Sequence, residues 1–175
     1  MKKVLILAGG CFWCTESVFK IVKGVVSLEC GYIGGQSTFP NYKEICTGNS
    51  GHAEAIKVIY DSEIVSFEEL LNVFFLSHDP TTLNRQGNDV GTQYRSAIFV
   101  DDQADRQFCL SFIEGIKSNY TTNIVTEVNV GHTFYPAEDY HQDYFNKNPF
   151  NSYCLFSIPP KLKKIEENCP NLLSK

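Results

Sequence analysis

The chain has neither an apolar run long enough to cross a membrane nor an excess of basic residues. A bilayer span needs about 20 apolar residues, and no segment approaches that length. The 15 Lys and Arg residues face 20 Asp and Glu residues, so the net charge is −5, and the densest basic stretch is residues 161–164. Nucleic acid binding requires clustered positive charge that neutralises phosphates. We therefore expect neither a nucleic-acid nor a membrane partner.

The cysteines lack the even number and regular spacing of a secreted disulfide framework, since there are 7 of them at irregular intervals. The start of the chain imitates a signal peptide, because two lysines precede an apolar stretch. However, that stretch, residues 4–8, is shorter than the roughly 7–15 apolar residues of a leader. One glycine too many also precedes Cys11 for a lipoprotein signal. We expect a protein of the reducing cytoplasm.

The chain also lacks internal repeats and linkers, so residues 1–175 are expected to form a single domain. Apolar patterns predict strands at 4–8, 25–30, 53–60, 96–100 and 124–130. Helical spacing predicts helices at 11–22, 40–46, 66–78, 102–117 and 137–145. Residues 79–94 are predicted to form a long polar loop, and residues 146–175 a loop-rich C-terminal tail. This order predicts an α+β fold of two layers, with helices on one face of a mixed sheet.

Cys11 lies in the string GGCFWCTE at residues 9–16, where a buried strand is followed by a helix. Unpaired N–H groups and the positive end of a helix dipole favour the thiolate, which is the nucleophile. Phe12 and Trp13 add two large apolar surfaces that suit a small apolar group. A buried cysteine is often only a small core residue. Two glycines, two aromatic residues and a helix start favour a reactive Cys11 instead.

Cys11 and Cys14 form a C-x-x-C pair, which is typical of two other kinds of site. A zinc site needs a second pair of ligands at short spacing, whereas the histidines are scattered at positions 52, 78, 132 and 141. We therefore expect no metal. Three residues along a helix place both sulfurs on one face, as in thioredoxin-like dithiol oxidoreductases. That alternative stays open on the pair alone.

Further motifs follow in a fixed order. They are GYIGG at 31–35, PNYKEICTGNSGHAE at 40–54, HDPTTLNRQGNDVGTQYRS at 78–96 and FYPAEDYHQ at 134–142. With these motifs, the chain between residues 9 and 154 resembles the peptide methionine sulfoxide reductase A family. The resemblance implies a ferredoxin-like plait with long active-site loops gathered around the nucleophile. Many family members have glycine at the position of Cys14, so the chain departs from the family there.

The resemblance implies reduction of the S-sulfoxide of methionine, free or in oxidatively damaged proteins, through a sulfenic acid on Cys11. Glu54 would be the acid, because a sulfoxide oxygen leaves poorly until protonated and burial near the aromatic pair would keep the carboxyl protonated. Tyr42 and Tyr94 would bind the same oxygen, and Asp89 would help to fix the site. Local sequence alone favours a solvent-facing strand carboxylate, two packing tyrosines and a turn-forming aspartate.

A second thiol must then condense with the sulfenic acid. Cys154 matches the position of the family's resolving cysteine, and its Asn, Pro and Ser neighbours suit a segment that moves. Cys14 is the alternative, although a disulfide to Cys11 within a helix is geometrically tight, and the two could act in relay. The resemblance implies thioredoxin as reductant with no other cofactor, and we expect a monomer. A module that binds oxidised methionine without turnover is a further alternative, with no use for Cys154.

Overall fold

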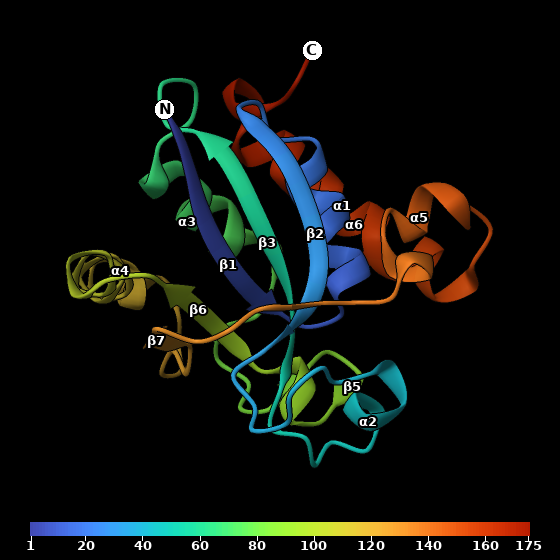
Figure 1. Cartoon of the computed structure of the whole chain (residues 1–175). Coiled ribbons are helices and arrows are strands. Elements are labelled where there is room, and N and C mark those ends of the chain that lie inside the picture. The colour runs from blue at the N-terminus through green and yellow to red at the C-terminus, as the bar shows by residue number, and fades with distance from the viewer.

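The computed structural model describes residues 1–175 and is built on one mixed sheet of 6 strands (Figure 1). Across the sheet the strands are β7 (Glu127–Val130), β6 (Ser96–Val100), β1 (Lys2–Gly9), β3 (Ala53–Asp61), β2 (Val25–Ile33) and β8 (Tyr135–Pro136). Neighbouring strands are antiparallel except β6 and β7, which are parallel. The predicted α+β class with a mixed sheet is therefore confirmed.

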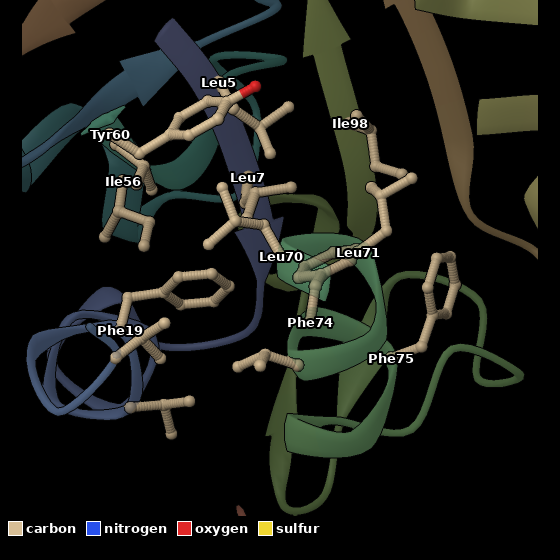
Figure 2. Close-up of a cluster of buried hydrophobic side chains, with 14 of the residues drawn as sticks. Leu5, Leu7, Phe19, Ile56, Tyr60, Leu70, Leu71, Phe74, Phe75 and Ile98 are labelled. Atoms are coloured by element: carbon tan, nitrogen blue, oxygen red, sulfur yellow. The ribbon is translucent and has the colours of Figure 1, made fainter. Parts of the chain in front are cut away.

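Helices α1 (Phe12–Lys20), α3 (Phe67–Ser77) and α4 (Gln103–Ile116) cover one face of this sheet. The apolar side chains between the layers form a core of 26 buried residues, and Figure 2 shows part of it where Leu7, Ile56 and Phe74 meet. Burying each such side chain contributes about 1.5–3 kcal/mol. The capping box of Ser66 and Glu69 is present at the start of α3, where the sequence places a helix start.

The opposite face of the sheet carries small side chains, including Ala8, Ala55 and Ala97. The segment between β7 and β8 crosses from one edge of the sheet to the other (Figure 1) and brings Phe134 against Gly31. A Cβ on Gly31 would lie 2.2 Å from Cζ of Phe134, so only glycine permits this approach. The crossing returns the chain to α1, beside which the short helix α5 (Tyr144–Lys147) lies.

The predicted loop-rich tail over residues 146–175 is wrong. Helix α6 spans Ser152–Asn168, and a 3-10 turn, η4 (Pro170–Leu172), follows it. Asn151 caps α6. The buried side chains of the helix recur at helical spacing and are Cys154, Ile158 and Ile165. Two adjacent prolines inside the helix obscure this pattern, but packing against α1 and α3 outweighs the backbone bonds that they remove. Because α6 packs on α1 and α3, it forms a third layer beyond the two that the sequence predicts.

The remaining elements are short. The predicted loop 79–94 contains a hairpin of β4 (Arg85–Gln86) and β5 (Asp89–Val90), followed by η1 (Thr92–Tyr94). The others are α2 (Tyr42–Cys46), η2 (Lys117–Asn119), η3 (Asp139–His141) and α5 (Tyr144–Lys147). In Figure 1, α2 and β5 lie together at the lower end of the sheet. No helix carries an apolar stretch of membrane-crossing length.

Candidate active site

A cavity of about 160 Å³ lies beside the start of α1 and is lined by 8 residues. They are Cys11, Phe12, Trp13, Tyr42, Glu54, Asp89, Tyr94 and Tyr153. All but Tyr153 are residues that the sequence selects as nucleophile, apolar pocket, acid, oxygen-binding phenols and supporting carboxylate. Sequence reasoning missed Tyr153, for which the signal available was its place directly before Cys154. The cavity therefore brings together residues from segments distant in the chain.

Cys11 immediately precedes the first turn of α1, and Gly10 makes the bend that leads into it. Gly10 has φ +96°, and a Cβ there would lie 2.6 Å from Cγ of Gln86, so both conformation and space require glycine. The Cys11 carbonyl accepts a hydrogen bond from the N–H of Cys14 at 3.1 Å, while the Cys11 side chain caps nothing. The sulfur is therefore free to line the cavity.

Glu54 is the second residue of β3 and is only 2% exposed. Its Oε1 accepts a hydrogen bond at 3.2 Å from the N–H of Phe12, the first residue of α1. Burial raises the pKa of this carboxyl to about 8, with the Phe12 N–H opposing the rise and Asp89 adding to it. The carboxyl is therefore mostly protonated at neutral pH and is a proton donor within the cavity.

Tyr42 begins α2 and Tyr94 ends η1, so two separate segments each supply a phenol. Burial raises the pKa of both hydroxyls, which therefore stay protonated and can donate hydrogen bonds. The N–H of Tyr42 donates to Glu138 Oε1 at 3.2 Å, which fixes the start of α2. Asp89 on β5 accepts a hydrogen bond from the hydroxyl of Tyr153. That bond ties the hairpin to α6.

Trp13 is held on two sides. Its ring stacks on Tyr144 with centroids 3.7 Å apart and planes 5° apart, and its Nε1 donates to Nδ1 of His141 at 3.1 Å. His141 is fully buried, and burial lowers its pKa, so the ring is neutral and can accept this bond. His141 therefore supports Trp13, and the local sequence likewise favours a structural role over a general base for this histidine.

Three of the cysteines share one buried cluster, whose members are Cys11, Cys14, Cys154 and Ile158. Cys154 is wholly buried on α6, so its position depends on the packing of α6 against α1. The apolar sequence surroundings of Cys30, Cys46 and Cys109 predict buried fillers. Cys30 and Cys109 are buried, whereas Cys46 is exposed, so the prediction is wrong for Cys46. The sulfur chemistry of the cavity is thus concentrated where α1 and α6 begin.

The pKa values within this cluster differ in direction. Burial raises the pKa of the Cys11 thiol well above its ordinary value, helped by a hydrogen bond to Cys14 and by Glu54. The pKa of Cys14 is lowered, first because the Cys11 thiol hydrogen-bonds to its sulfur and then through the Lys161 ammonium. The expectation that the helix start acidifies Cys11 is therefore wrong, because desolvation outweighs the helix dipole.

Chemically, the cavity combines a sulfur nucleophile, a protonated carboxyl and two phenols around an apolar pocket. Such a set suits a thiol-dependent reductase that removes an oxygen from a substrate with a small apolar group. Within residues 1–175, the cavity included, no group of at least 3 His, Cys, Asp or Glu side chains could hold a metal ion.

Known proteins share both the sequence and the fold. Residues 3–172 match the family described as peptide methionine sulfoxide reductase, and the chain belongs to that family. It is 50% identical over 176 residues to the peptide methionine sulfoxide reductase MsrA of Trichodesmium erythraeum, with 99% of each chain covered.

Two solved structures of one yeast relative are also similar. Mxr1 from Saccharomyces cerevisiae in reduced form gives a TM-score of 0.84 at 37% identity, covering 87% of this chain and 89% of that one. Mxr1 in complex with Trx2 gives a TM-score of 0.59 at 26% identity, covering 82% and 84%. The chain is therefore similar to Mxr1 over most of its length, both to the reduced form and to the form in complex with Trx2.

Proposed function

We propose that the chain is a peptide-methionine (S)-S-oxide reductase that repairs oxidised proteins and free methionine sulfoxide. The observation that carries this proposal is the single cavity in which the Cys11 sulfur, the protonated Glu54 carboxyl and the aromatic pair meet. Family membership over residues 3–172 supports the same substrate. Methionine sulfoxide offers a methyl group, a basic oxygen and an electrophilic sulfur, and the cavity has a partner for each.

In the first step the methyl group of the substrate packs against Phe12 and Trp13. The sulfoxide oxygen accepts hydrogen bonds from Glu54 and the two phenols, and the Cys11 sulfur attacks the sulfoxide sulfur. Glu54 gives a proton to the oxygen and recovers one from the Cys11 thiol, so no net proton is consumed. Oxygen is transferred, methionine leaves, and Cys11 becomes a sulfenic acid.

The cavity also accounts for selection of one epimer. The sulfoxide sulfur is chiral, and its methyl group, oxygen and remaining side chain must each meet a different fixed surface. Trp13 is immobilised by Tyr144 and His141, and Glu54 is fixed by the N–H of Phe12. The opposite epimer would exchange the methyl group and the oxygen, which leaves the oxygen on an apolar wall without a donor. The S-epimer is the one that the family resemblance implies.

The sulfenic acid then condenses with a second thiol and releases water. We propose that Cys154 and Cys14 fill this role together in relay, because all three sulfurs share one cluster. Thioredoxin reduces the resulting disulfide and no prosthetic group takes part. The structure of the relative Mxr1 with the thioredoxin Trx2 supports this electron donor.

We also propose a single catalytic domain over residues 1–175 that acts as a cytoplasmic monomer, without nucleic-acid or membrane partners. Its core would be a ferredoxin-like plait, for which the strand order β6-β1-β3-β2 and the chain order β-α-β-β-α-β are the support. Light scattering of the purified chain tests the monomer, since a dimer would double the measured mass.

The function is tested by single-turnover reduction of a racemic methionine sulfoxide peptide by fully reduced protein, without added reductant. We expect loss of the S-sulfoxide alone, at least about one equivalent of methionine per chain, and one new disulfide by mass spectrometry. Binding of the peptide without methionine formation would favour a binding module. Reduction of insulin disulfides with no consumption of either epimer would favour a thioredoxin-like oxidoreductase.

A further inference from the structure

Lys161, on the third turn of α6, is a partly buried cation without a counter-ion. No carboxylate lies within ion-pair distance of its ammonium group, although other lysines of the chain have such partners. The one hydrogen bond of the ammonium is to the carbonyl oxygen of Ser77, at 2.6 Å. Burial of an unpaired charge costs free energy unless an anion compensates it.

Lys161 and Cys14 line the same small cavity. The residues that line this cavity are Gly9, Cys14, Thr15, Val18, Ser77 and Lys161. Lys161 is two turns beyond Cys154 on α6, and α6 packs against α1 (Figure 1). Cys14 is the one group lining that cavity that can become an anion. The geometry therefore pairs the free cation with the Cys14 sulfur.

The other titratable groups around Cys14 do not cancel the effect of the Lys161 charge on the Cys14 sulfur. They are Cys11 before α1, Glu54 on β3, Asp89 on β5, and Tyr153 and Cys154 on α6. Glu54 is mostly protonated at neutral pH, the first turn of α1 has no acidic residue, and Asp89 is engaged by the hydroxyl of Tyr153. Lys161 is thus the cation that acts on the Cys14 sulfur, and it lowers the pKa of that thiol.

We propose that Lys161 is a positioning residue that holds Cys14 as the thiolate, so that Cys14 attacks the Cys11 sulfenic acid before Cys154 reacts. The inference rests on the proposed function for the step that generates the sulfenic acid. In the attack, a bond forms between the sulfurs of Cys14 and Cys11 and the sulfur–oxygen bond of Cys11 breaks. The oxygen leaves as water with a proton from Glu54.

Cys154 acts second in this scheme. Burial raises the pKa of its thiol to about 11, so little thiolate is present at neutral pH. When it attacks the Cys14 sulfur, the bond between Cys11 and Cys14 breaks, Cys11 leaves as a thiol, and a Cys14–Cys154 disulfide forms. The two thiols of thioredoxin then reduce that disulfide by exchange. Each step moves one electron pair between sulfurs and needs no further reactant.

The hydrogen bond to Ser77 also gives Lys161 a structural role, because Ser77 is the last residue of α3 and a cation stabilises a helix C-terminus. The two roles separate in Lys161→Gln, whose side-chain amide can still donate to the Ser77 carbonyl but carries no charge. Lys161→Arg keeps the charge, and Lys164→Gln removes a charge one turn further along α6 as the matched control.

The test is a pH titration of the reduced protein carrying ¹³Cβ-labelled cysteine, followed by NMR, with the Cys14 signal assigned by its loss in Cys14→Ser. We expect the Cys14 midpoint to rise by about one pH unit in Lys161→Gln, which is tenfold less thiolate. It should return toward the wild-type value in Lys161→Arg and stay unchanged in Lys164→Gln. An unchanged midpoint in a folded Lys161→Gln protein overturns the proposal. No sulfoxide is involved, so the outcome is independent of the proposed activity.

A second measurement covers the case in which Lys161→Gln does not fold. Wild-type protein is mixed with one equivalent of sulfoxide peptide, quenched with acid at successive times, and mapped for disulfides by mass spectrometry. The Cys11–Cys14 bond should appear before any bond to Cys154. A first bond between Cys11 and Cys154 would overturn the order, and failure to form methionine would instead count against the proposed function.

Discussion

Helices α1 and α6 begin at the same cluster of sulfurs, and each carries a cysteine as its third residue, yet the two starts are built differently. The first turn of α6 is capped by the side chain of Asn151, which accepts from the N–H of Cys154 at 3.0 Å. The first turn of α1 has no side-chain cap, and its first N–H is bound by the buried Glu54 carboxyl instead. One start is stabilised locally, and the other depends on a residue of the active site.

The two helix starts also differ in the pKa values of their cysteines. Cys14 and Cys154 have equivalent positions at a helix N-terminus and are both buried, so neither the dipole nor burial separates them. The pKa of Cys14 is nevertheless lowered, whereas that of Cys154 is raised to about 11. What Cys14 has in addition is the Cys11 thiol and the Lys161 ammonium. Neighbouring groups therefore decide the reactivity of a thiol at a helix start.

The largest expected effect is at the start of α1. Replacing Cys11 with Ser should lower the single-turnover rate of sulfoxide reduction by at least about 10³-fold, because a hydroxyl is a far weaker nucleophile than a thiol. Quantifying methionine by chromatography checks this. Cys46→Ser is the matched control, since Cys46 is exposed and lies outside the cavity, and it should react at the wild-type rate. Full activity in the Cys11 variant would assign the nucleophile to another cysteine.

Glu54→Gln should have the next largest effect. An amide keeps the acceptor for the N–H of Phe12 but cannot give up a proton, so the single-turnover rate should fall by about 10²–10³-fold. In the wild type the acid form of Glu54 exists below its pKa of about 8, so the rate should decline as pH rises through that value. The variant should lose this decline. A rate profile with the same decline in both proteins would remove Glu54 from the proton transfer.

Removal of Cys14 or Cys154 should slow repeated turnover with thioredoxin more than it slows the first reduction of sulfoxide. Cys14→Ser should lower thioredoxin-coupled turnover at least about tenfold, because the intramolecular attack on the sulfenic acid is lost. Cys154→Ser should lower it less and accumulate the Cys11–Cys14 disulfide. Steady-state assays with thioredoxin, thioredoxin reductase and NADPH, followed by disulfide mapping, check both. The reverse ranking would mean that the capped start of α6 supplies the first resolving thiol.

Local patterns predicted much of the α1 start and little of the α6 start. Gly10 and Cys11 follow an apolar strand directly, so the bend and the sulfur at the helix start are encoded within a few residues. The helix α6 was missed because its adjacent prolines argue against a helix, and only its burial on α1 and α3 compensates for them. Long-range packing of that kind leaves no local signal.

The same reason explains the missed members of the site. Tyr153 reaches Asp89 only because α6 docks against the β4–β5 hairpin, and two such short strands have no periodicity to detect. The pKa of Cys11 was also predicted in the wrong direction. Its place at a helix start is visible in the sequence, but the desolvation that raises its pKa depends on the whole cluster. Residue roles that depend on assembled surroundings need the structure.

The smallest effect that we predict is at the Asn151 cap of α6. Asn151→Ala removes the α6 cap and should lower the free energy of unfolding by about 1 kcal/mol in urea. If only the first turn of α6 opens more often, alkylation of Cys154 in the reduced protein should quicken by about fivefold. Asp102→Ala removes the equivalent cap of α4, far from the sulfurs, and should cost similar stability without that increase. Equal labelling in both variants would mean that Cys154 is exposed by global unfolding, and the capped start of α6 would not control access to it.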